Sequence, residues 1–148
     1  MRALLIVDRL FAQHERAMLE RTAIGLLDEG IETRLVVPDL GLFKTTKLGV
    51  LAPQVKYKDR GLSFTLKIRA ANIIRELTTD RGLDDWNIVH AFGGQSWALA
   101  QELAKSLNSA MVLELWRAGL IPRATQFIKN TPLNCMITAP DKTIERAA

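Results

Sequence analysis

Short apolar runs alternate along the chain with longer stretches in which apolar residues recur every three or four positions. The short runs have the length and composition of buried strands and lie at 4–7, 33–37, 88–91, 111–115 and 133–138, with weaker ones at 50–51 and 55–57. Four stripes typical of helices fall among them: Leu19, Ala23, Leu26 and Leu27; Leu66, Ala70, Ile73, Ile74 and Leu77; Ala100, Leu103, Ala104 and Leu107; and Ile121 with Phe127. Repeated units of this kind predict an α/β fold, a doubly wound and mainly parallel sheet of about five to seven strands with helices on both faces.

The end of the chain has the pattern of a helix start. Pro140 and Asp141 suit a first turn, yet the chain ends at Ala148, about two turns later. Residues 1–148 are therefore expected to form a single domain that was excised as the N-terminal half of a two-domain protein. A naturally short protein with a frayed last helix is the alternative.

The composition is that of an ordinary soluble globular domain. Hydrophobic residues make up 48% and charged residues 24% of 148, which argues against disorder and against a fibrous chain. The apolar opening, residues 3–7, stops at Asp8 and is too short for a signal peptide or a spanning helix, so we expect a cytoplasmic protein. The single cysteine, Cys135, cannot form an internal disulfide, and its apolar neighbours predict a buried structural thiol.

The most informative stretch is 87–94, which reads NIVHAFGG. Its apolar residues predict a buried strand, and Gly93 and Gly94 then allow a sharp turn into a helix whose expected N-cap is Ser96. His90 therefore comes close to a helix N-terminus, where free backbone N–H groups favour anionic or phosphorylated ligands. A histidine packed in the core, followed by an ordinary glycine turn, is the alternative interpretation.

Polar residues follow several predicted strands, and the carboxyl ends of parallel strands lie at one edge of a sheet. They are Asp8, Arg9, His14 and Glu15 after the first strand, Gly93, Gly94 and Gln95 after the fourth, Trp116 and Arg117 after the fifth, and Asp141 after the last. We expect them to line one crevice. Trp116 suits stacking on a sugar ring, with Arg117 close by to hold a phosphate, or it fills the core. His14 and Glu15 either bind a ligand or begin a solvated helix.

Several familiar chemistries have no motif in this sequence. There is no G-x-G-x-x-G after the first strand, no G-x-x-x-x-G-K-[ST] and no G-x-S-x-G. The two histidines and one cysteine have no zinc-site spacing, so no metal site is expected.

Charge is unevenly distributed. Residues 41–75 hold eight basic residues and one acid, a net charge of +7, while the remainder of the chain carries −3. The basic positions of interest are Lys44, Lys47, Lys56, Lys58, Arg60, Lys67 and Arg69, and they are mixed with Leu42, Phe43, Tyr57 and Phe64. This mixture favours contact with anionic lipid headgroups, and a merely solvated face is the alternative. Nucleic acid is not expected as a partner because no known reading module is present.

Three segments resemble the N-terminal half of group 1 glycosyltransferases of the GT-B fold, whose halves are Rossmann-like. They are the helix end LLDEGIET at 26–33, the stretch WNIVHAFGG at 86–94, which is similar to the family's D-h-V-H-x-H-G, and the strand with the start of a helix from 133. The resemblance covers nearly the whole chain.

The resemblance implies transfer of a sugar from a nucleotide diphosphate sugar to a sugar or lipid acceptor, without a required metal or resident cofactor. This chain would be the acceptor-binding half, and a C-terminal Rossmann-like domain, its missing partner, would hold most of the donor. His90 would be catalytic and border the acceptor pocket with Gly94, while Arg9 or Arg117 would face the donor phosphates. The isolated chain would be inactive, and a peripheral position at the inner membrane face fits the basic segment.

The chain also departs from the family pattern. The loop after the first strand lacks the family's glycine pair, Phe92 replaces the second histidine of H-x-H, and Trp116 stands near the position of a further histidine. A noncatalytic α/β domain that binds a ligand or another protein is therefore the alternative function.

Overall fold

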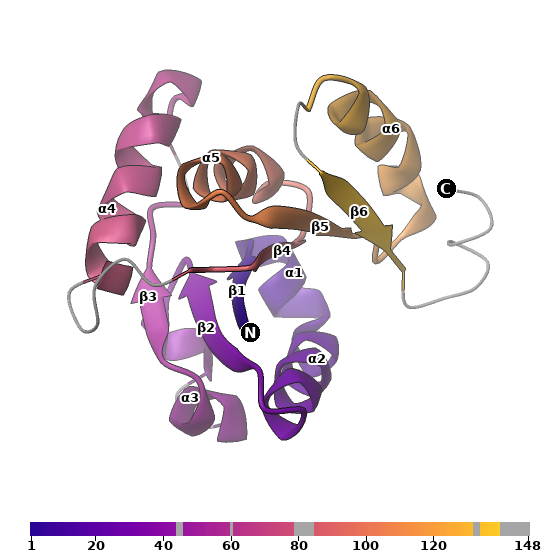
Figure 1. Ribbon diagram of the computed structural model, residues 1–148. Coiled ribbons are helices and arrows are strands. Elements are labelled where there is room, and N and C mark those ends of the chain that lie inside the picture. Colours follow the sequence, from indigo (N-terminus) through magenta and orange to yellow (C-terminus); the bar gives the residue numbers. More distant parts are fainter. Residues whose placement is uncertain (44–45, 60, 79–84, 132–133, 140–148) are drawn as a thin grey trace.

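The computed structural model describes residues 1–148 except 44–45, 60, 79–84, 132–133 and 140–148 (Figure 1). In this described part, six strands form one sheet in the order β3-β2-β1-β4-β5-β6, and all neighbouring pairs are parallel. The strands are β1 (Arg2–Val7), β2 (Glu32–Val37), β3 (Gln54–Lys56), β4 (Ile88–Phe92), β5 (Ala110–Glu114) and β6 (Cys135–Thr138). The predicted doubly wound parallel α/β fold is confirmed. The strand order reverses between β1 and β4, and the carboxyl ends of these two strands mark the place where ligands commonly bind in such sheets.

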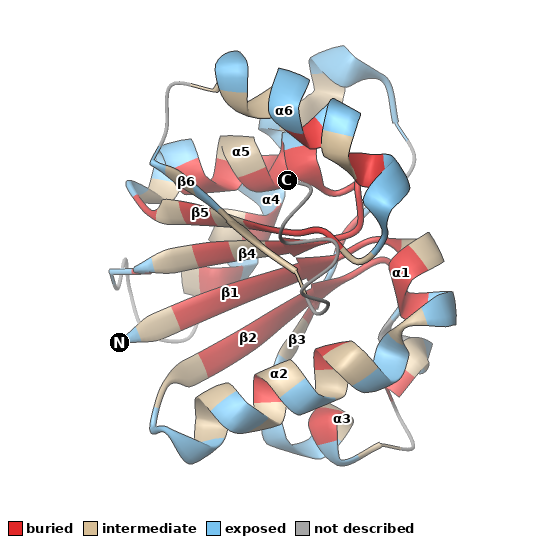
Figure 2. Cartoon of the chain, turned by 90° about the vertical axis from the view of Figure 1, so that its right-hand side faces the viewer, coloured by how far each residue is buried: buried red, intermediate tan, exposed pale blue. Residues whose placement is uncertain are grey.

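Helices cover both faces of the sheet (Figures 1 and 2). One side carries α1 (Arg9–His14), α2 (Arg16–Asp28) and α3 (Lys47–Leu51), and the other carries α4 (Leu66–Thr78), α5 (Trp97–Leu107) and α6 (Ile121–Lys129). Three 3₁₀ turns, η1 (Leu40–Phe43), η2 (Ser63–Thr65) and η3 (Ala118–Leu120), lie in the connections. Since every strand-to-strand connection crosses over through helix, the sheet has buried residues on both faces.

Alternate strand residues build two separate cores. Leu4 and Ile6 of β1 face the α4 to α6 side, where they join Ile73 and Leu103, and all four are at most 2% exposed. Leu5 of β1 faces the other side, in the core that holds Phe11 and Leu19. The strands are apolar at successive positions, most completely in β1, because both sides of a central strand need apolar side chains.

Two short helices were not anticipated. Residues 50–51, expected as a weak strand, end α3, because Leu48 turns into the α2-side core while Val50 and Leu51 stay exposed. Helix α1 occupies the segment expected as a loop after β1. It begins where a carboxylate oxygen of Asp8 accepts a hydrogen bond from the N–H of Phe11, and it buries Phe11 in the core.

Two expected local features differ in detail. Ser96 precedes α5 as expected, but its hydroxyl accepts no bond from the helix and donates instead to the carbonyl oxygen of Gly93 at 2.8 Å. Cys135 is only half-buried, because β6 is an edge strand with α6 on one side only; this partial burial raises the pKa of its thiol. The helix expected from Pro140 lies outside the described residues.

Among the described helices, none combines the length and the apolar composition that crossing a membrane requires.

Candidate functional site

Asp8 directly follows β1 and lies where the strand order reverses, between β1 and β4. Its carboxylate is buried, with the residue 2% exposed, and its two oxygens accept from the N–H of Phe11 at 2.7 Å and from the N–H of Gln95 at 2.9 Å. Its own N–H donates to the carbonyl oxygen of Phe92 at 2.9 Å. Asp8 thus accepts hydrogen bonds from backbone N–H groups at the start of α1 and just ahead of α5. Without this carboxylate, the same N–H groups would attract an external anion.

Gly93 and Gly94 each allow a close approach, but to different parts of the structure. Gly93 has φ +94°, and a Cβ there would overlap the carboxylate of Asp8. A Cβ on Gly94 would instead lie 3.3 Å from Leu120 and 3.2 Å from the guanidinium of Arg123, which belong to the segment after β5. Gly93 is therefore required for the close approach of Asp8, whereas Gly94 allows close packing on the α6 side.

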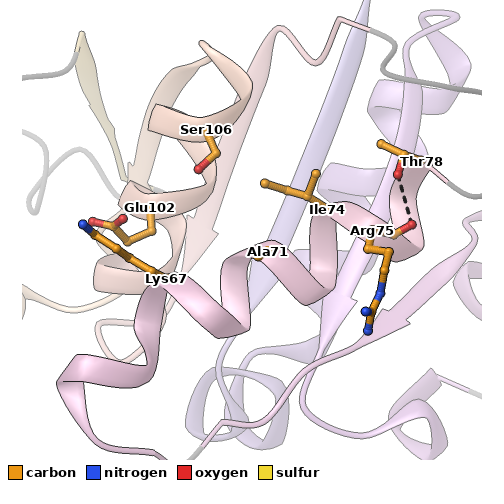
Figure 3. A pocket seen from close by; sticks show the side chains of 7 residues that line it. All are labelled: Lys67, Ala71, Ile74, Arg75, Thr78, Glu102 and Ser106. Carbon is orange, nitrogen blue, oxygen red and sulfur yellow. Dashed lines mark hydrogen bonds between the residues drawn. The ribbon is translucent and has the colours of Figure 1, made fainter.

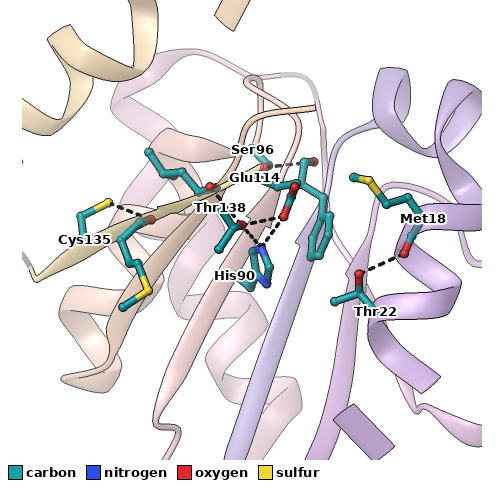
Figure 4. Close-up of polar contacts among 10 residues, drawn as sticks. Met18, Thr22, His90, Ser96, Glu114, Cys135 and Thr138 are labelled. Atoms are coloured by element: carbon teal, nitrogen blue, oxygen red, sulfur yellow. Dashed lines mark hydrogen bonds and ion pairs between the residues drawn. The ribbon is translucent and has the colours of Figure 1, made fainter. Parts of the chain in front are cut away.

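His90 belongs to a polar cluster on three neighbouring strands (Figure 4). Its Nε2 lies 3.2 Å from Oε2 of Glu114, and the hydroxyl of Thr138 donates to the same oxygen at 2.7 Å. The imidazole also stacks on Phe92, with ring centroids 4.2 Å apart. The side chains of His90 and Glu114 are 12% and 8% exposed. Three strands therefore fix the orientation of one histidine ring.

The cluster lies on a part of the sheet that is only partly covered. In the register, His90 sits beside Val112, and Val112 sits beside Met136. Side chains so paired share a face, and here it is the α2 side, since Phe92 belongs to the core of that side. Val112 is partly exposed and Met136 is 65% exposed. The His90 ring thus borders an open part of the sheet.

The arrangement of His90 and Glu114 suits proton transfer. When Nε2 carries the proton and donates it to Glu114, Nδ1 becomes the basic nitrogen, and Nδ1 has no hydrogen-bond partner among the described residues. Sequence reasoning singled out His90 but not Glu114 or Thr138. The available signal was one acid inside the apolar run at 111–115.

A cavity of about 220 Å³ lies at the carboxyl edge of the sheet, on the α4 and α5 side. Asp59, which lines this cavity, accepts a hydrogen bond from Nε of Arg9 at 2.8 Å, and this bond raises the pKa of the Arg9 guanidinium. Arg69 donates from Nη1 to the carbonyl oxygen of Lys58 at 3.0 Å, while its Nε has no partner among the described residues. The lining consists of Tyr57, Asp59, Gly61, Ser63, Leu66, Arg69, Gln95, Ala98 and Leu99.

Tyr57 contributes to the wall of this cavity as a structural residue. Its hydroxyl donates to the carbonyl oxygen of Val7 at 2.9 Å, and burial raises the pKa of the hydroxyl above its usual range. This bond ties the end of β3 to the end of β1.

The remaining predicted site residues are spread along the edge. Trp116 packs edge-on against Phe11, with centroids 5.7 Å apart, and the guanidinium of Arg117 lies 4.8 Å from the Trp116 ring. His14 is exposed in the last turn of α1, and Glu15 joins α1 to α2. Asp141 lies outside the described residues.

The structure brings some of the predicted residues together and separates others. Gln95 lines the cavity at the carboxyl edge, and Arg9 contacts it through Asp59. His90 and Gly94, expected to border one pocket, lie on opposite sides of the sheet, since His90 stacks on Phe92 and Gly94 faces Leu120.

The basic segment is mostly exposed in the described part. Lys44 and Arg60 fall outside the described residues; Lys47, Lys56, Lys58 and Lys67 are exposed, and Arg69 is partly buried. Phe43 and Tyr57 were expected on this surface but are 0% and 7% exposed, because both pack into the cores. Phe64, by contrast, is 76% exposed.

A second cavity, of about 560 Å³, is a groove between the outer faces of α4 and α5 (Figure 3). Ala71 and Ile74 provide apolar surface, and Lys67 of α4 and Glu102 of α5 provide charged side chains. Within the described residues, no three His, Cys, Asp or Glu side chains gather in an arrangement that could hold a metal ion.

Comparisons of the chain with protein-family models, with curated proteins and with solved structures give no match. The resemblance to group 1 glycosyltransferases therefore stays a prediction made from the motifs alone.

Proposed function

We propose that the chain is the acceptor-binding domain of a glycosyltransferase that moves a sugar from a nucleotide diphosphate sugar to a sugar or lipid acceptor. The observation that carries this proposal is the pair formed by His90 and Glu114, which borders an open part of the sheet. His90 lies two residues before the carboxyl end of β4, and Glu114 is the last residue of β5. The strand order supports it, because it reverses between β1 and β4. The similarity of residues 86–94 to the family motif adds to this support.

In this proposal, His90 contacts the acceptor. Glu114 holds the Nε2 side of the imidazole, so that Nδ1 accepts a hydrogen bond from an acceptor hydroxyl and increases its nucleophilicity. Thr138 keeps the carboxylate of Glu114 in place. Glu114 and Thr138 are positioning residues, since they act on the substrate only through His90.

The donor is assigned mainly to a second Rossmann-like domain, which we propose as the partner of this chain. Asp8 already takes the N–H groups of Phe11 and Gln95, so the loop after β1 offers few donors to a diphosphate. We assign the donor phosphates to the exposed guanidinium of Arg117 or to that of Arg9 beside Asp59.

The isolated chain of 148 residues is expected to show no glycosyl transfer and no measurable affinity for nucleotide sugars, because half of the cleft and most donor contacts are missing. Transfer assays with a set of nucleotide sugars, compared with a heat-treated sample, and calorimetric titration test this. Turnover above the heat-treated level would contradict the two-domain assignment.

Replacement of His90 by alanine is expected to lower the turnover of the two-domain enzyme by more than about tenfold, which corresponds to about 1.4 kcal/mol in the activation free energy. Glu114→Gln should lower it less, since the amide oxygen can still hold the ring. Lys129→Ala, an exposed change in the last turn of α6, is the control. An unchanged turnover rate and an unchanged acceptor affinity in the His90→Ala enzyme would mean that His90 has only a packing role.

The second candidate function is a noncatalytic α/β domain that binds a ligand or another protein. Two observations favour it: the carboxylate of Asp8 occupies the N–H groups at the strand-order reversal, and Phe92 is fully buried where the family motif has a second histidine. Sugar binding without transfer, both by this chain and by a longer protein that contains it, would support this second function.

A further inference from the structure

Three apolar side chains protrude from the start of α4. Leu62, Phe64 and Ile68 are 64%, 76% and 63% exposed. Leu66, Ala70 and Ile73 fasten the same helix to the sheet, so the exposed residues are not needed for its packing. Phe64 lies in η2 and Ile68 in the first turn of α4, about one helical turn apart.

Basic side chains surround these apolar residues. Lys67 is exposed between Phe64 and Ile68, and Lys58 is exposed on a segment that Arg69 ties to α4 through the Lys58 carbonyl. Asp59, the acid in this segment, is paired with Arg9, and Glu102 of α5, which lines a groove with Lys67, is paired with Lys105. Glu76 lies two turns further along α4, in a groove that also includes Lys56 and Arg75. The start of α4 therefore carries a positive field.

We propose that Lys58, Leu62, Phe64, Lys67 and Ile68, here called the α4 docking surface, bind the surface of an anionic lipid bilayer. Apolar side chains that protrude by more than half of their area insert between headgroups, and the neighbouring lysines meet the lipid phosphates. A protein partner would be favoured by a large continuous apolar patch, but Ser63, Thr65 and Lys67 separate the three exposed apolar residues along the chain.

Docking would bring the carboxyl edge of the sheet to the membrane. Gly61, Ser63 and Leu66 line the cavity of about 220 Å³, so this cavity begins at the α4 docking surface itself. The docking proposal does not depend on the proposed glycosyl transfer.

Co-sedimentation of the 148-residue chain with vesicles tests the docking. We expect binding to vesicles of phosphatidylcholine mixed with phosphatidylglycerol and none to phosphatidylcholine alone. The binding should weaken as salt is added, because exposed charges are screened within about 8 Å at physiological ionic strength.

Two variants separate the contributions of the surface. Phe64→Ser combined with Ile68→Ser, and Lys58→Gln combined with Lys67→Gln, should each weaken binding about tenfold or more. Met136→Ser is the matched control, since Met136 is 65% exposed on β6, outside the basic segment. Unchanged melting temperatures would show that the variants are folded.

Equal binding to neutral and anionic vesicles, no binding to either, or full binding by both double variants would overturn the proposal. Polyglutamate and single-stranded DNA serve as parallel probes. Capture of either of them with no binding to anionic vesicles would assign the surface to an acidic protein or a nucleic acid. None of these measurements contains a sugar donor, so their failure is distinct from failure of the proposed transfer.

Discussion

Gly93→Ala is expected to destabilise the protein by about 4 kcal/mol or more, a large part of the roughly 5–15 kcal/mol that holds a typical domain folded. At φ +94° an alanine is strained by about 1–2 kcal/mol. Its Cβ would also overlap the carboxylate of Asp8, which cannot retreat without losing its bonds to Phe11 and Gln95. Hydrogen bonds to a charged group contribute about 1.5–3 kcal/mol each.

Urea unfolding followed by circular dichroism measures this loss. Gly25→Ala is the matched control, because Gly25 lies in the interior of α2 with nothing within 4 Å of its added Cβ. That change should stabilise the protein by about 0.5–1 kcal/mol. A Gly93→Ala protein within about 1 kcal/mol of wild type would mean that Asp8 can move aside at little cost.

The fold was predictable because nearly all of its signals are local. A parallel sheet with two covered faces needs strands that are apolar at most positions; the run at 4–7 is wholly apolar, and those at 33–37 and 88–91 are mostly apolar. The stripes of α2, α4 and α5 are long enough to fix a helical period. The errors fall on α1 and α3, which are too short to show a period.

The site was less predictable because its contacts join distant parts of the chain. His90 meets Glu114 and Thr138 only through the register of β4, β5 and β6, which no local pattern reveals. His90 and Gly94 are close in sequence, yet the backbone turn at Gly93 directs them to opposite sides of the sheet. The role of Asp8 likewise depends on the approach of β4 to β1.

The second large loss is expected for Asp8→Ala, about 3 kcal/mol or more. The change removes the N-cap bond of α1, so that the N–H groups of Phe11 and Gln95 both lose their acceptors. Each unsatisfied buried group costs about 1–3 kcal/mol. Asp8→Asn should lie between wild type and Asp8→Ala, because its amide has one carbonyl oxygen to accept with and its NH₂ faces the other N–H.

A double-mutant cycle tests whether Gly93 acts through Asp8. In the Asp8→Ala background, Gly93→Ala should cost only the backbone strain of about 1–2 kcal/mol, so the two losses should not add. Full additivity would mean that the overlap with Asp8 contributes nothing to the requirement for glycine.

The same Asp8→Ala protein reports whether Asp8 stands in for a bound anion. The freed N–H groups lie at the start of α1 and just ahead of α5, beside the strand-order reversal, where phosphate is favoured by backbone donors and helix dipoles. Inorganic phosphate should therefore raise the melting temperature of Asp8→Ala in a concentration-dependent manner and leave that of wild type unchanged. Sodium chloride at matched ionic strength is the control for screening. Equal stabilisation of both proteins would show that phosphate acts elsewhere and that the carboxylate of Asp8 serves only as a helix cap and a tie between β1 and β4.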